Sequence, residues 1–446
     1  MKRLFFCLAV LGVILTGCSK NDDGKSDKPN NNGNEQPENP NEPELPELPA
    51  LPDPDDVCSA MDDLNFMAYC YENFDVNKDG KVSVTEANAA KEIYTTSSKW
   101  VSVKGIERFP NIEILSLNGS SITELDLRYN LKLKSISGYS SLLTTVLLPN
   151  TLTSIEKSAF KECASLIEIH FPASLTSIGV NAFYGCSSLT EINFPASLTL
   201  IGGSAFRGCS SLVEIHLSDN LTSIGEYAFS GCSSLTEINF PASLTSIRGF
   251  AFSGCSSLVE IHLPDNLTSI GERAFWSCSS LTEIHLPASL TWIGGSAFSG
   301  CSNLTKINLP DNLTSIGKTA FSGCSSLTEI HFPASLTSIG EYAFSGCSSL
   351  TEINLPASLA SIGESAFSGC SSLTEINFPA SLTSIGESAF SFCSSLTEVI
   401  CYALVPPKLN GFSNSTIENL YVPAESIQAY KDSSWAIYFK NILPIE

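Results

Sequence analysis

The feature that most constrains the fold is an internal repeat of 23 residues, which occupies most of this chain of 446 residues. The unit reads L-T-S-I-G-x-x-A-F-x-G-C-S-S-L-T-E-I-N/H-F/L-P-A/D-S/N. Each unit has an apolar face that it cannot bury alone, so neighbouring units must stack to form a continuous core. The repeat therefore predicts an elongated solenoid over residues 152–404. Its first Leu recurs eleven times, at positions 152, 175, 198, 221, 244, 267, 290, 313, 336, 359 and 382.

The second unit shows how one repeat should fold. Leu189, Ile192 and Phe194 follow the spacing L-x-x-L-x-L and should point inward from a strand. Glu191 and Asn193 alternate with them and should share the outer face of that strand. A second short inward pair and a helical or irregular return around the Ala-Phe dipeptide complete the unit. One unit per coil makes neighbouring strands parallel, about 4.8 Å apart.

These units resemble the BspA-like leucine-rich-repeat family of bacterial surface proteins, and the resemblance covers about residues 101–446. Residues 101–151 are expected to form shorter, irregular repeats that act as an N-terminal cap. Residues 405–446, which begin with a break at Val405-Pro406-Pro407, resemble the C-terminal cap of the family. The irregular repeats are indicated by an apolar run at Ile112, Leu115 and Leu117 that recurs at Ile122, Leu125 and Leu127.

Residues 1–17 are typical of a cleaved signal peptide, because Lys2 and Arg3 precede an apolar run too short to span a bilayer. The run ends in Leu-Thr-Gly-Cys, which resembles a bacterial lipobox and implies a lipid on Cys18. An ordinary secretory signal with an incidental cysteine is the alternative. Residues 20–23 resemble the acidic stretch that sends some lipoproteins to the outer face of the outer membrane. A lipid-anchored location on the cell surface is therefore expected, with no membrane-crossing segment.

The chain is strongly acidic, with 24 Lys and Arg against 46 Asp and Glu. This balance disfavours nucleic acid and anionic lipid as partners. Residues 18–57 are rich in acidic residues and contain eight prolines between Pro29 and Pro54. Such a segment cannot form regular backbone hydrogen bonds and is expected to be a semi-extended spacer.

Residues 75–86 match the EF-hand pattern D-x-[DN]-x-[DN]-G-x5-E. A helix at residues 61–74 and another at 85–94 should flank this loop, giving a small α-helical module at 58–100 before the solenoid. A lone loop predicts weak calcium affinity and a structural role, with the ion fastening the module to the first repeat. The alternative is a surface turn that binds nothing. The expected oxygen ligands come from the side chains of Asp75, Asn77, Asp79, Ser83 and Glu86 and the carbonyl of Lys81.

The outer face of the repeated strand should carry a column of ten glutamates, interrupted once by Lys306. Like charges on neighbouring strands oppose one another, so one interpretation is a solvated face that prevents sheets from associating. The other is an acidic recognition stripe for a basic partner or for divalent cations. His262 and His285, in successive repeats of the adjacent column, could also form an adventitious zinc or copper site. The column comprises Glu168, Glu191, Glu214, Glu237, Glu260, Glu283, Glu329, Glu352, Glu375 and Glu398.

Cysteine recurs every 23 residues from Cys163 to Cys393. Equivalent Cβ atoms in adjacent coils should lie about 4.8 Å apart with parallel vectors, a separation longer than a disulfide prefers. Buried apolar packing explains this column better than disulfides or a metal. Cys58 and Cys70 could not pair if both lay on one helix, because helical rise would separate them by about 18 Å.

Ser, His and Glu recur in columns and do not converge as unlike residues at one place, so catalysis is not expected. The leading hypothesis is an adhesin or interaction scaffold that binds host or bacterial surface proteins. A carbohydrate-binding accessory protein of an outer-membrane nutrient system and a passive envelope protein are the alternatives. A glycan binder should show clustered aromatic side chains. The candidates are Tyr184, Tyr227, Phe250, Trp276, Trp292 and Tyr342, at variable positions of the repeat.

Overall fold

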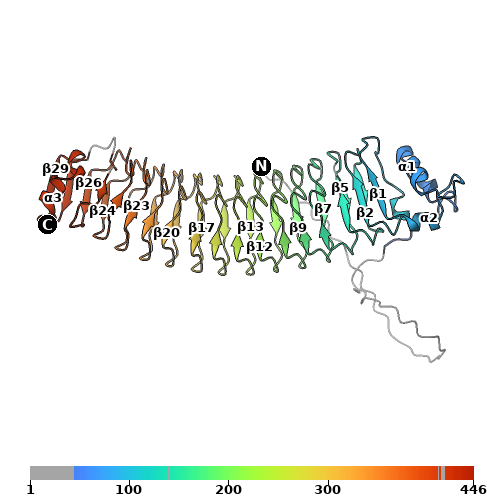
Figure 1. Cartoon of the computed structure of the whole chain (residues 1–446), viewed down its shortest axis with the longest axis horizontal. Coiled ribbons are helices and arrows are strands. Elements are labelled where there is room, and N and C mark those ends of the chain that lie inside the picture. Colours follow the sequence, from blue (N-terminus) through green and yellow to red (C-terminus); the bar gives the residue numbers. More distant parts are fainter. Residues whose placement is uncertain (1–44, 139, 410, 413–416, 446) are drawn as a thin grey trace, which may run out of the picture. The chain divides into compact units, whose positions relative to one another are not determined.

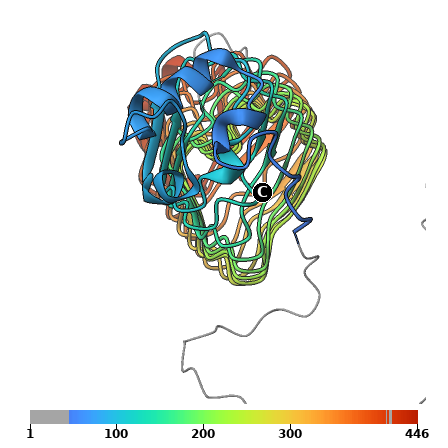
Figure 2. The ribbon, with the colours of Figure 1, turned by 90° about the vertical axis from the view of Figure 1, so that its right-hand side faces the viewer.

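The computed structural model describes residues 45–138, 140–409, 411–412 and 417–445. Residues 47–446 form one unit in which successive coils stack along a single axis (Figure 1). Seen along that axis, the coils of the array overlie one another (Figure 2). Within the described residues, no helix has both the length and the apolar character needed to cross a membrane. The signal peptide, Cys18 and the spacer up to residue 44 lie outside the described residues.

One side of the array, called the strand face here, is formed by short parallel strands in which each residue pairs with its equivalent 23 positions along the chain. In the three-residue strands of this face the middle side chain is buried and the flanking two are exposed, as at Ile192, and the two four-residue strands at the C-terminal end also bury alternate side chains. The predicted alternation and parallel pairing are confirmed. The strands are β7 (Glu168–His170), β9 (Glu191–Asn193), β11 (Glu214–His216), β13 (Glu237–Asn239), β15 (Glu260–His262), β17 (Glu283–His285), β19 (Lys306–Asn308), β21 (Glu329–His331), β24 (Glu375–Phe378) and β26 (Glu398–Cys401).

A second parallel series comes from the Ser-Ile positions of the repeat, where Ile178, for example, is buried and pairs with Ile201. These strands close the other side of each coil. They are β6 (Ser154–Ile155), β8 (Ser177–Ile178), β10 (Leu200–Ile201), β12 (Ser223–Ile224), β14 (Ser246–Ile247), β16 (Ser269–Ile270), β18 (Trp292–Ile293), β20 (Ser315–Ile316), β22 (Ser338–Ile339), β23 (Ser361–Ile362) and β25 (Ser384–Ile385).

The core consists of columns of identical side chains. The Phe of each Ala-Phe dipeptide is fully buried and stacks nearly parallel on its neighbours, with ring centroids 5.1 Å apart for Phe183 and Phe206. Partly buried Phe194 packs edge-on against Phe206 at 5.5 Å. Because every coil offers the Phe of its Ala-Phe dipeptide at the same height, each repeat buries its apolar face on the next, as the repeat pattern requires.

The return segment between the Ser-Ile strand and the strand face consists of turns and contains no helix among the described residues. The residue before each Ala-Phe dipeptide adopts a left-handed conformation, for example Ser204 at φ +54°. A second left-handed position lies two residues after the Phe and is usually Gly, for example Gly208 at φ +76°. These segments form what we call the return face of the solenoid.

The N-terminal repeats differ from the sequence-based expectation. The two apolar runs around Leu115 and Leu125 were predicted to be successive short repeats, but their strands join different sheets. Ten residues are too few for a full coil, so the runs form two sides of one coil, and equivalent strands lie 21 residues apart. The elements are β1 (Glu92–Thr95), β2 (Ile114–Leu117) and β4 (Ser135–Ser137) in one sheet, and β3 (Glu124–Asp126) and β5 (Thr145–Leu147) beside β7 in the other, with η2 (Ile106–Arg108) preceding β2.

The module before the repeats contains η1 (Val57–Ala60), α1 (Leu64–Phe74) and α2 (Val84–Ala89). The outgoing helix was predicted to reach residue 94 but ends at Ala89, because the following segment pairs as β1 with β2. Asp63 caps α1 by accepting hydrogen bonds from the N–H groups of Asn65 and Phe66. Its other carboxylate oxygen accepts from the N–H groups of Val101 at 2.6 Å and Ser102 at 3.1 Å. One buried carboxylate thus ties the helix to the first coil.

The C-terminal end is closed by aromatic side chains. Trp435 is fully buried and donates its indole N–H to the carbonyl of Pro407 at 2.8 Å, while the Tyr430 hydroxyl donates to the carbonyl of Ala403 at 2.9 Å. Within the described residues this end consists of three strands, one α-helix and two 3-10 helices. The elements are β27 (Lys408–Leu409), β28 (Asn419–Val422), η3 (Ala424–Ser426), α3 (Ile427–Lys431), η4 (Ser434–Ile437) and β29 (Asn441–Pro444).

Candidate functional site

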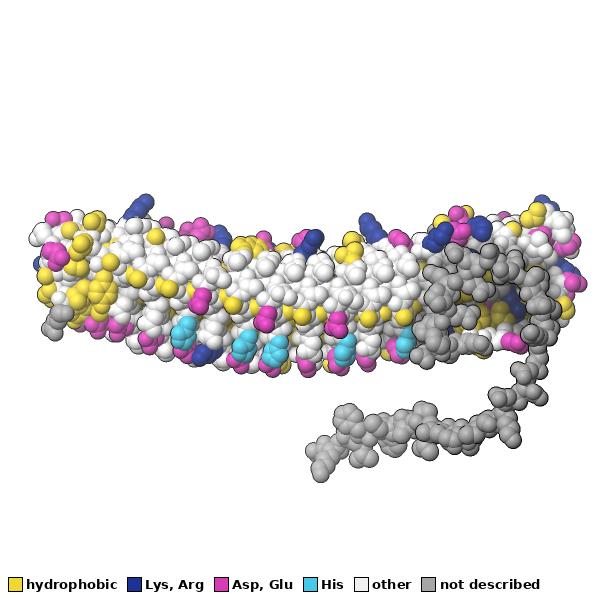
Figure 3. Space-filling model, turned by 90° about the horizontal axis from the view of Figure 1, so that it is seen from below, with side chains coloured by type: hydrophobic (Ala, Val, Ile, Leu, Met, Phe, Trp, Pro, Cys, Tyr) yellow, Lys and Arg dark blue, Asp and Glu magenta, His cyan; other side chains and the backbone are white. Residues whose placement is uncertain are grey.

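The predicted glutamate column lies on the strand face. In the paired strands the glutamates are direct neighbours, for example Glu191, Glu214 and Glu237. Nine of the ten are exposed, and Glu398 at the C-terminal end is half-buried. Lys306 stands between Glu283 and Glu329 in register, and its Nζ lies 3.6 Å from a Glu329 carboxylate oxygen. Figure 3 shows acidic side chains and all the histidines gathered along one edge of the solenoid.

Nine of these glutamates have a polar partner two residues further along the same strand. Asn193, for example, donates its side-chain N–H to Glu191 at 2.7 Å, and the imidazole Nε2 of His262 lies 3.2 Å from a Glu260 oxygen. The Asn or His column therefore contacts the carboxylates within each strand. His262 and His285 are neighbours with ring centroids 6.2 Å apart, but each engages the glutamate of its own strand. Across the described residues, no group of three or more His, Cys, Asp or Glu is placed to hold a metal ion.

The cysteine column lies in the core. All eleven repeat cysteines are free thiols and buried, which confirms the packing interpretation. Each of them also donates a hydrogen bond to a backbone carbonyl of an earlier coil; Cys209, for example, donates to the carbonyl of Phe183 at 3.3 Å. Burial raises the pKa of these thiols, to about 11 for Cys163 and about 12 for Cys347. They are therefore structural groups and are poor nucleophiles.

The loop predicted to bind calcium is closed by its own carboxylates. Asp75 accepts hydrogen bonds from the N–H groups of Asp79 at 3.2 Å and Gly80 at 3.0 Å, and Gly80 makes the turn at φ +83°. The Asn77 side-chain N–H donates to Asp79 at 2.9 Å. Glu86 accepts from the N–H of Val76 at 2.9 Å. These contacts wrap the loop around carboxylate oxygens.

Glu86 also closes the N-terminus of α2. Its Oε2 accepts from both the N–H and the hydroxyl of Ser83, which completes a capping box. Hydrogen bonds from Ser83, and further ones from Val76 and Asn77, lower the pKa of Glu86 to about 2. The carboxylate is therefore ionised at neutral pH, as a calcium ligand must be. Val76 and Asn77 donate to one Glu86 oxygen and Ser83 donates twice to the other, so four hydrogen bonds occupy the four lone-pair sites of this carboxylate. A cation bound by Glu86 would therefore have to replace some of these hydrogen bonds.

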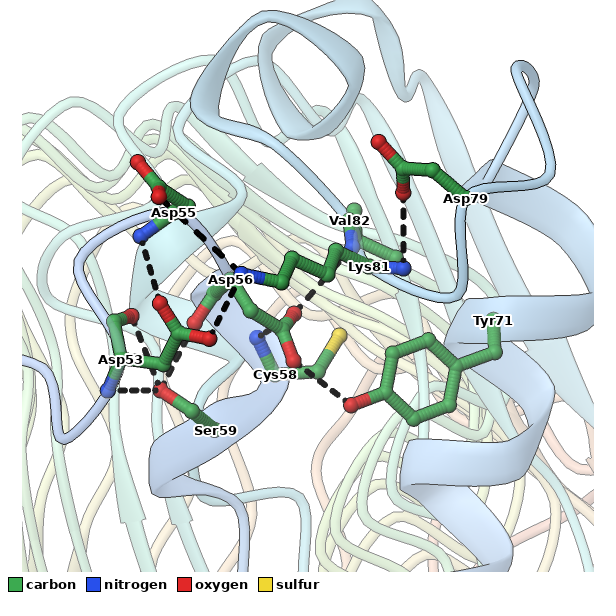
Figure 4. A network of polar contacts seen from close by, with 9 residues as sticks. All are labelled: Asp53, Asp55, Asp56, Cys58, Ser59, Tyr71, Asp79, Lys81 and Val82. Atoms are coloured by element: carbon green, nitrogen blue, oxygen red, sulfur yellow. Dashed lines mark hydrogen bonds and ion pairs between the residues drawn. The ribbon is translucent and has the colours of Figure 1, made fainter.

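The segment that precedes α1 packs against the loop at residues 75–86 (Figure 4). The Val57 N–H donates to the carbonyl of Val82 at 2.9 Å, and the Val82 N–H donates to Asp56 at 3.1 Å. Asp56 is buried and also accepts the Tyr71 hydroxyl at 2.7 Å. The Lys81 Nζ lies 2.9 Å from Asp53. Residues 53–58 therefore supply the pairing segment that a lone loop would otherwise lack, a contact that no sequence motif marked.

Cys58 and Cys70 are not on one helix, which corrects the separation argument made from the sequence. Cys58 lies in η1 and Cys70 in α1, and both are fully buried. Burial, together with a hydrogen bond that the Cys70 thiol donates to the Cys58 sulfur, raises the pKa of the Cys70 thiol well above its usual range. The two thiols are therefore in contact in the core of the module.

The return face, together with Trp292 of the adjoining strand β18, carries a hollow of about 1050 Å³ that spans six consecutive repeats. Of the aromatic residues singled out in the sequence, Tyr227, Phe250, Trp276 and Trp292 line it. Sequence reasoning identified these aromatics individually but missed that they converge. It also missed the basic residues that stand among them at the same variable positions of the repeat, Arg207, Arg273 and Lys318. Figure 3 shows Lys and Arg side chains projecting mainly from the edge opposite the histidines.

The chain matches the family model described as BspA type leucine-rich repeat region, over residues 133–249, 222–341 and 314–436. These segments overlap and together cover more than half of the chain. No curated protein matches it.

Among solved structures, the chain is similar to a leucine-rich repeat protein from Bacteroides ovatus. The two are 31% identical over 73% of this chain and 84% of that one, with a TM-score of 0.56. A leucine-rich cell surface protein from Faecalibacterium prausnitzii is 27% identical over 73% of this chain and 84% of that chain, with a TM-score of 0.43.

Proposed function

Since this chain belongs to the BspA-type leucine-rich repeat family, we propose that it is a cell-surface adhesin or interaction scaffold that binds host or bacterial surface proteins. The observation that carries the proposal is the in-register glutamate column on the strand face. A long row of exposed carboxylates on a rigid array complements a basic surface on a partner protein. Because Ser, His and Glu recur as columns, the proposal includes no catalytic role.

The binding proposal is tested with the purified full chain on immobilised basic extracellular-matrix proteins. The variant Glu237→Gln, Glu260→Gln removes two adjacent strand-face charges, and Glu364→Gln, Glu387→Gln removes two from the return side as a matched control. The first variant should weaken binding and reduce its salt dependence, while the control should not. Equal effects of the two variants, or no binding by the wild type, would overturn the role of the column.

We propose that Cys18 carries the lipid that anchors the protein to the outer membrane. The support is the sequence Leu-Thr-Gly-Cys at the end of the apolar run. Cells grown with a clickable fatty acid should label the wild type and a Cys7→Ala control but not Cys18→Ala. Labelling of Cys18→Ala would rule out this anchor. Protease accessibility on intact cells then distinguishes the outer face from the inner face of the membrane.

We also propose that residues 75–86 bind calcium, with side-chain oxygens from Asp75, Asn77, Asp79, Ser83 and Glu86 and the carbonyl of Lys81. The support is the all-oxygen donor set in the EF-hand spacing. The ion would stiffen the module that pairs with residues 53–58 and contacts the first coil. An affinity in the range of about 10⁻⁴ to 10⁻³ M is expected for a lone loop.

Calcium should raise the melting temperature of the wild type at millimolar concentration. Glu86→Gln should abolish this response. Asp55→Asn, which changes an exposed acid beside the loop in Figure 4, should retain it. If calcium does not change the melting temperature of the wild type, the proposal is contradicted.

A second candidate function is that of a carbohydrate-binding accessory protein. One observation favours it: aromatic side chains gather in the hollow of the return face. This surface is separate from the glutamate column, so the two functions can be tested independently.

A further inference from the structure

Two residues that line the hollow on the return face differ from the residues at the same positions of the preceding repeat. Trp276 stands where the preceding repeat has Ser253, and Trp292 stands where it has Ser269. These two indoles are 44% and 50% exposed. An exposed tryptophan adds little to the stacking of coils, and a cluster of exposed aromatics is typical of a binding surface. The departures therefore point to selection for contact with a ligand.

The backbone under the hollow gives a second, independent indication. The left-handed position before each Ala-Phe dipeptide is held by Ser, Asn or Thr in seven of the eleven repeats. Three consecutive repeats instead place Tyr227, Phe250 and Arg273 there, at φ +58°, +57° and +54°. Bulky side chains are disfavoured in this conformation. All three residues line the hollow.

These side chains stack on one another along the solenoid axis. The Arg207 guanidinium lies 4.9 Å from the centre of the Tyr227 ring, and the Tyr227 and Phe250 rings are stacked at 4.4 Å. The Arg273 guanidinium lies 5.2 Å from the Phe250 ring centre. Cation–π contacts of this kind hold two guanidinium groups in fixed positions, so little side-chain freedom is lost when they bind an anion.

The charge of the hollow is opposite to that of the chain. Its lining contains Arg207, Arg273 and Lys318 but only one acid, Glu272, whereas acids outnumber bases 46 to 24 in the whole sequence. Glu272 lies 3.7 Å from Arg273, and Lys318 also contacts Glu341 outside the lining. A positive hollow on a strongly acidic protein is complementary to an anionic ligand.

We propose that this hollow binds an anionic glycan. The apolar faces of its sugar rings would lie on the exposed indoles of Trp276 and Trp292. Its carboxylate or sulfate groups would be bound by Arg207 and Arg273, whose planar guanidinium groups suit such anions. Uronate and sulfate groups share this chemistry. The site goes beyond the protein-binding role assigned to the strand face and uses different residues.

The experiment measures binding of the full chain to polygalacturonate, heparin, neutral dextran and poly-glutamate by calorimetry. Trp276→Ser, Trp292→Ser restores the residues of the neighbouring repeats, and so does Arg273→Ser, since the next repeat has Ser296 there. Tyr342→Ser is the matched control, because Tyr342 occupies the same left-handed column outside the hollow. Unchanged melting temperatures establish that the variants fold.

The wild type should bind at least one anionic glycan and not dextran, and the comparison of polygalacturonate with heparin identifies carboxylate or sulfate as the group recognised. The tryptophan double variant and Arg273→Ser should each raise the Kd for the glycan at least tenfold. The control Tyr342→Ser should raise it less than twofold. The proposal is overturned if neither anionic glycan binds, if the variants bind as the wild type does, or if poly-glutamate binds at the same site equally well. Glycan binding without matrix-protein binding would keep this site and overturn the adhesin role.

Discussion

The strand face and the return face are built from the same repeats but differ in how strictly the repeat is kept. Ten of eleven positions in the strand-face column are Glu, and each lies beside its equivalent in the next coil. The return face keeps small residues at most of its variable positions but concentrates aromatic and basic residues in six consecutive coils. Columns of identical residues are what the stacking of coils requires. A local cluster of residues that differ from the repeat is instead what we expect of a binding site for a specific ligand.

The comparison predicts the largest effect inside the coil, where the columns do not vary. Phe252 is fully buried and stacks on Phe229 and Phe275 at 5.4 and 5.5 Å. Phe252→Ala should lower the free energy of unfolding by about 3–5 kcal/mol, because it opens a cavity between two rings. Urea unfolding followed by circular dichroism measures this change. A loss below about 1 kcal/mol would show that the Phe column does not hold the array together.

The ends of the array should depend on unique residues, because the repeat contacts stop there. Asp63→Ala should cost about 2–4 kcal/mol, since it removes a helix cap and leaves the N–H groups of Val101 and Ser102 without their acceptor. The neighbouring exposed Asp62→Ala is the control and should change little. Hydrogen exchange of α1 and the first coil measures the effect. Equal protection in the two variants would contradict it.

Low pH should destabilise the same contact between α1 and the first coil, because Asp63 becomes protonated. Burial alone would raise the pKa of Asp63, but hydrogen bonds from Val101, Phe66, Ser102 and Asn65 outweigh it and hold the pKa below its usual value. A depressed pKa means that the stabilisation is complete above the unfolded value, about 4, and is lost as the pH falls further. Exchange protection of α1 should therefore decrease below about pH 4 in the wild type and be less pH-dependent in Asp63→Ala.

A smaller effect is expected on the strand face, where like charges are neighbours. Glu237→Lys should raise the free energy of unfolding by roughly 0.2–1 kcal/mol, because it places a cation between Glu214 and Glu260. Lys306→Glu should lower it by a similar amount, since Lys306 lies between two glutamates in register. Thermal unfolding at low salt compares the two. Changes of the same sign would contradict the electrostatic account.

The smallest effect on stability is expected in the hollow. Trp292→Ser restores the residue found in the preceding repeat and removes a side chain that is half exposed. The free energy of unfolding should change by less than about 0.5 kcal/mol. A loss above 1 kcal/mol by urea unfolding would mean that Trp292 is retained for stability and not for recognition.

The sequence predicted the solenoid well because its information is periodic: Leu189 and Ile192 recur in register, so burial and strand pairing follow from one repeat. It failed where periodicity ends. The runs around Leu115 and Leu125 have the right spacing for a strand, but only the coil length shows that they lie in two sheets. Residues 92–94 were predicted to end a helix, but they belong to β1 and pair with β2.

The two candidate sites show the same limit. The loop at residues 75–86 matches a calcium-binding pattern in the sequence because its expected ligands lie within twelve residues, whereas the contact between Val57 and Val82 depends on the fold. The hollow could not be predicted, because Arg207 and Trp292 are 85 residues apart in the sequence and are brought to one surface only by the stacking of coils. A search for departures from the repeat that recur at neighbouring coils would have found it.

The central claim, that the return face and not the strand face recognises the anionic glycan, is tested most directly by hydrogen exchange of the full chain with and without heparin or polygalacturonate. The account predicts added protection in the return segments around Tyr227, Phe250, Arg273 and Ser296, with the strands from β11 to β19 unchanged. Protection confined to those strands, or none anywhere with either glycan, would contradict it.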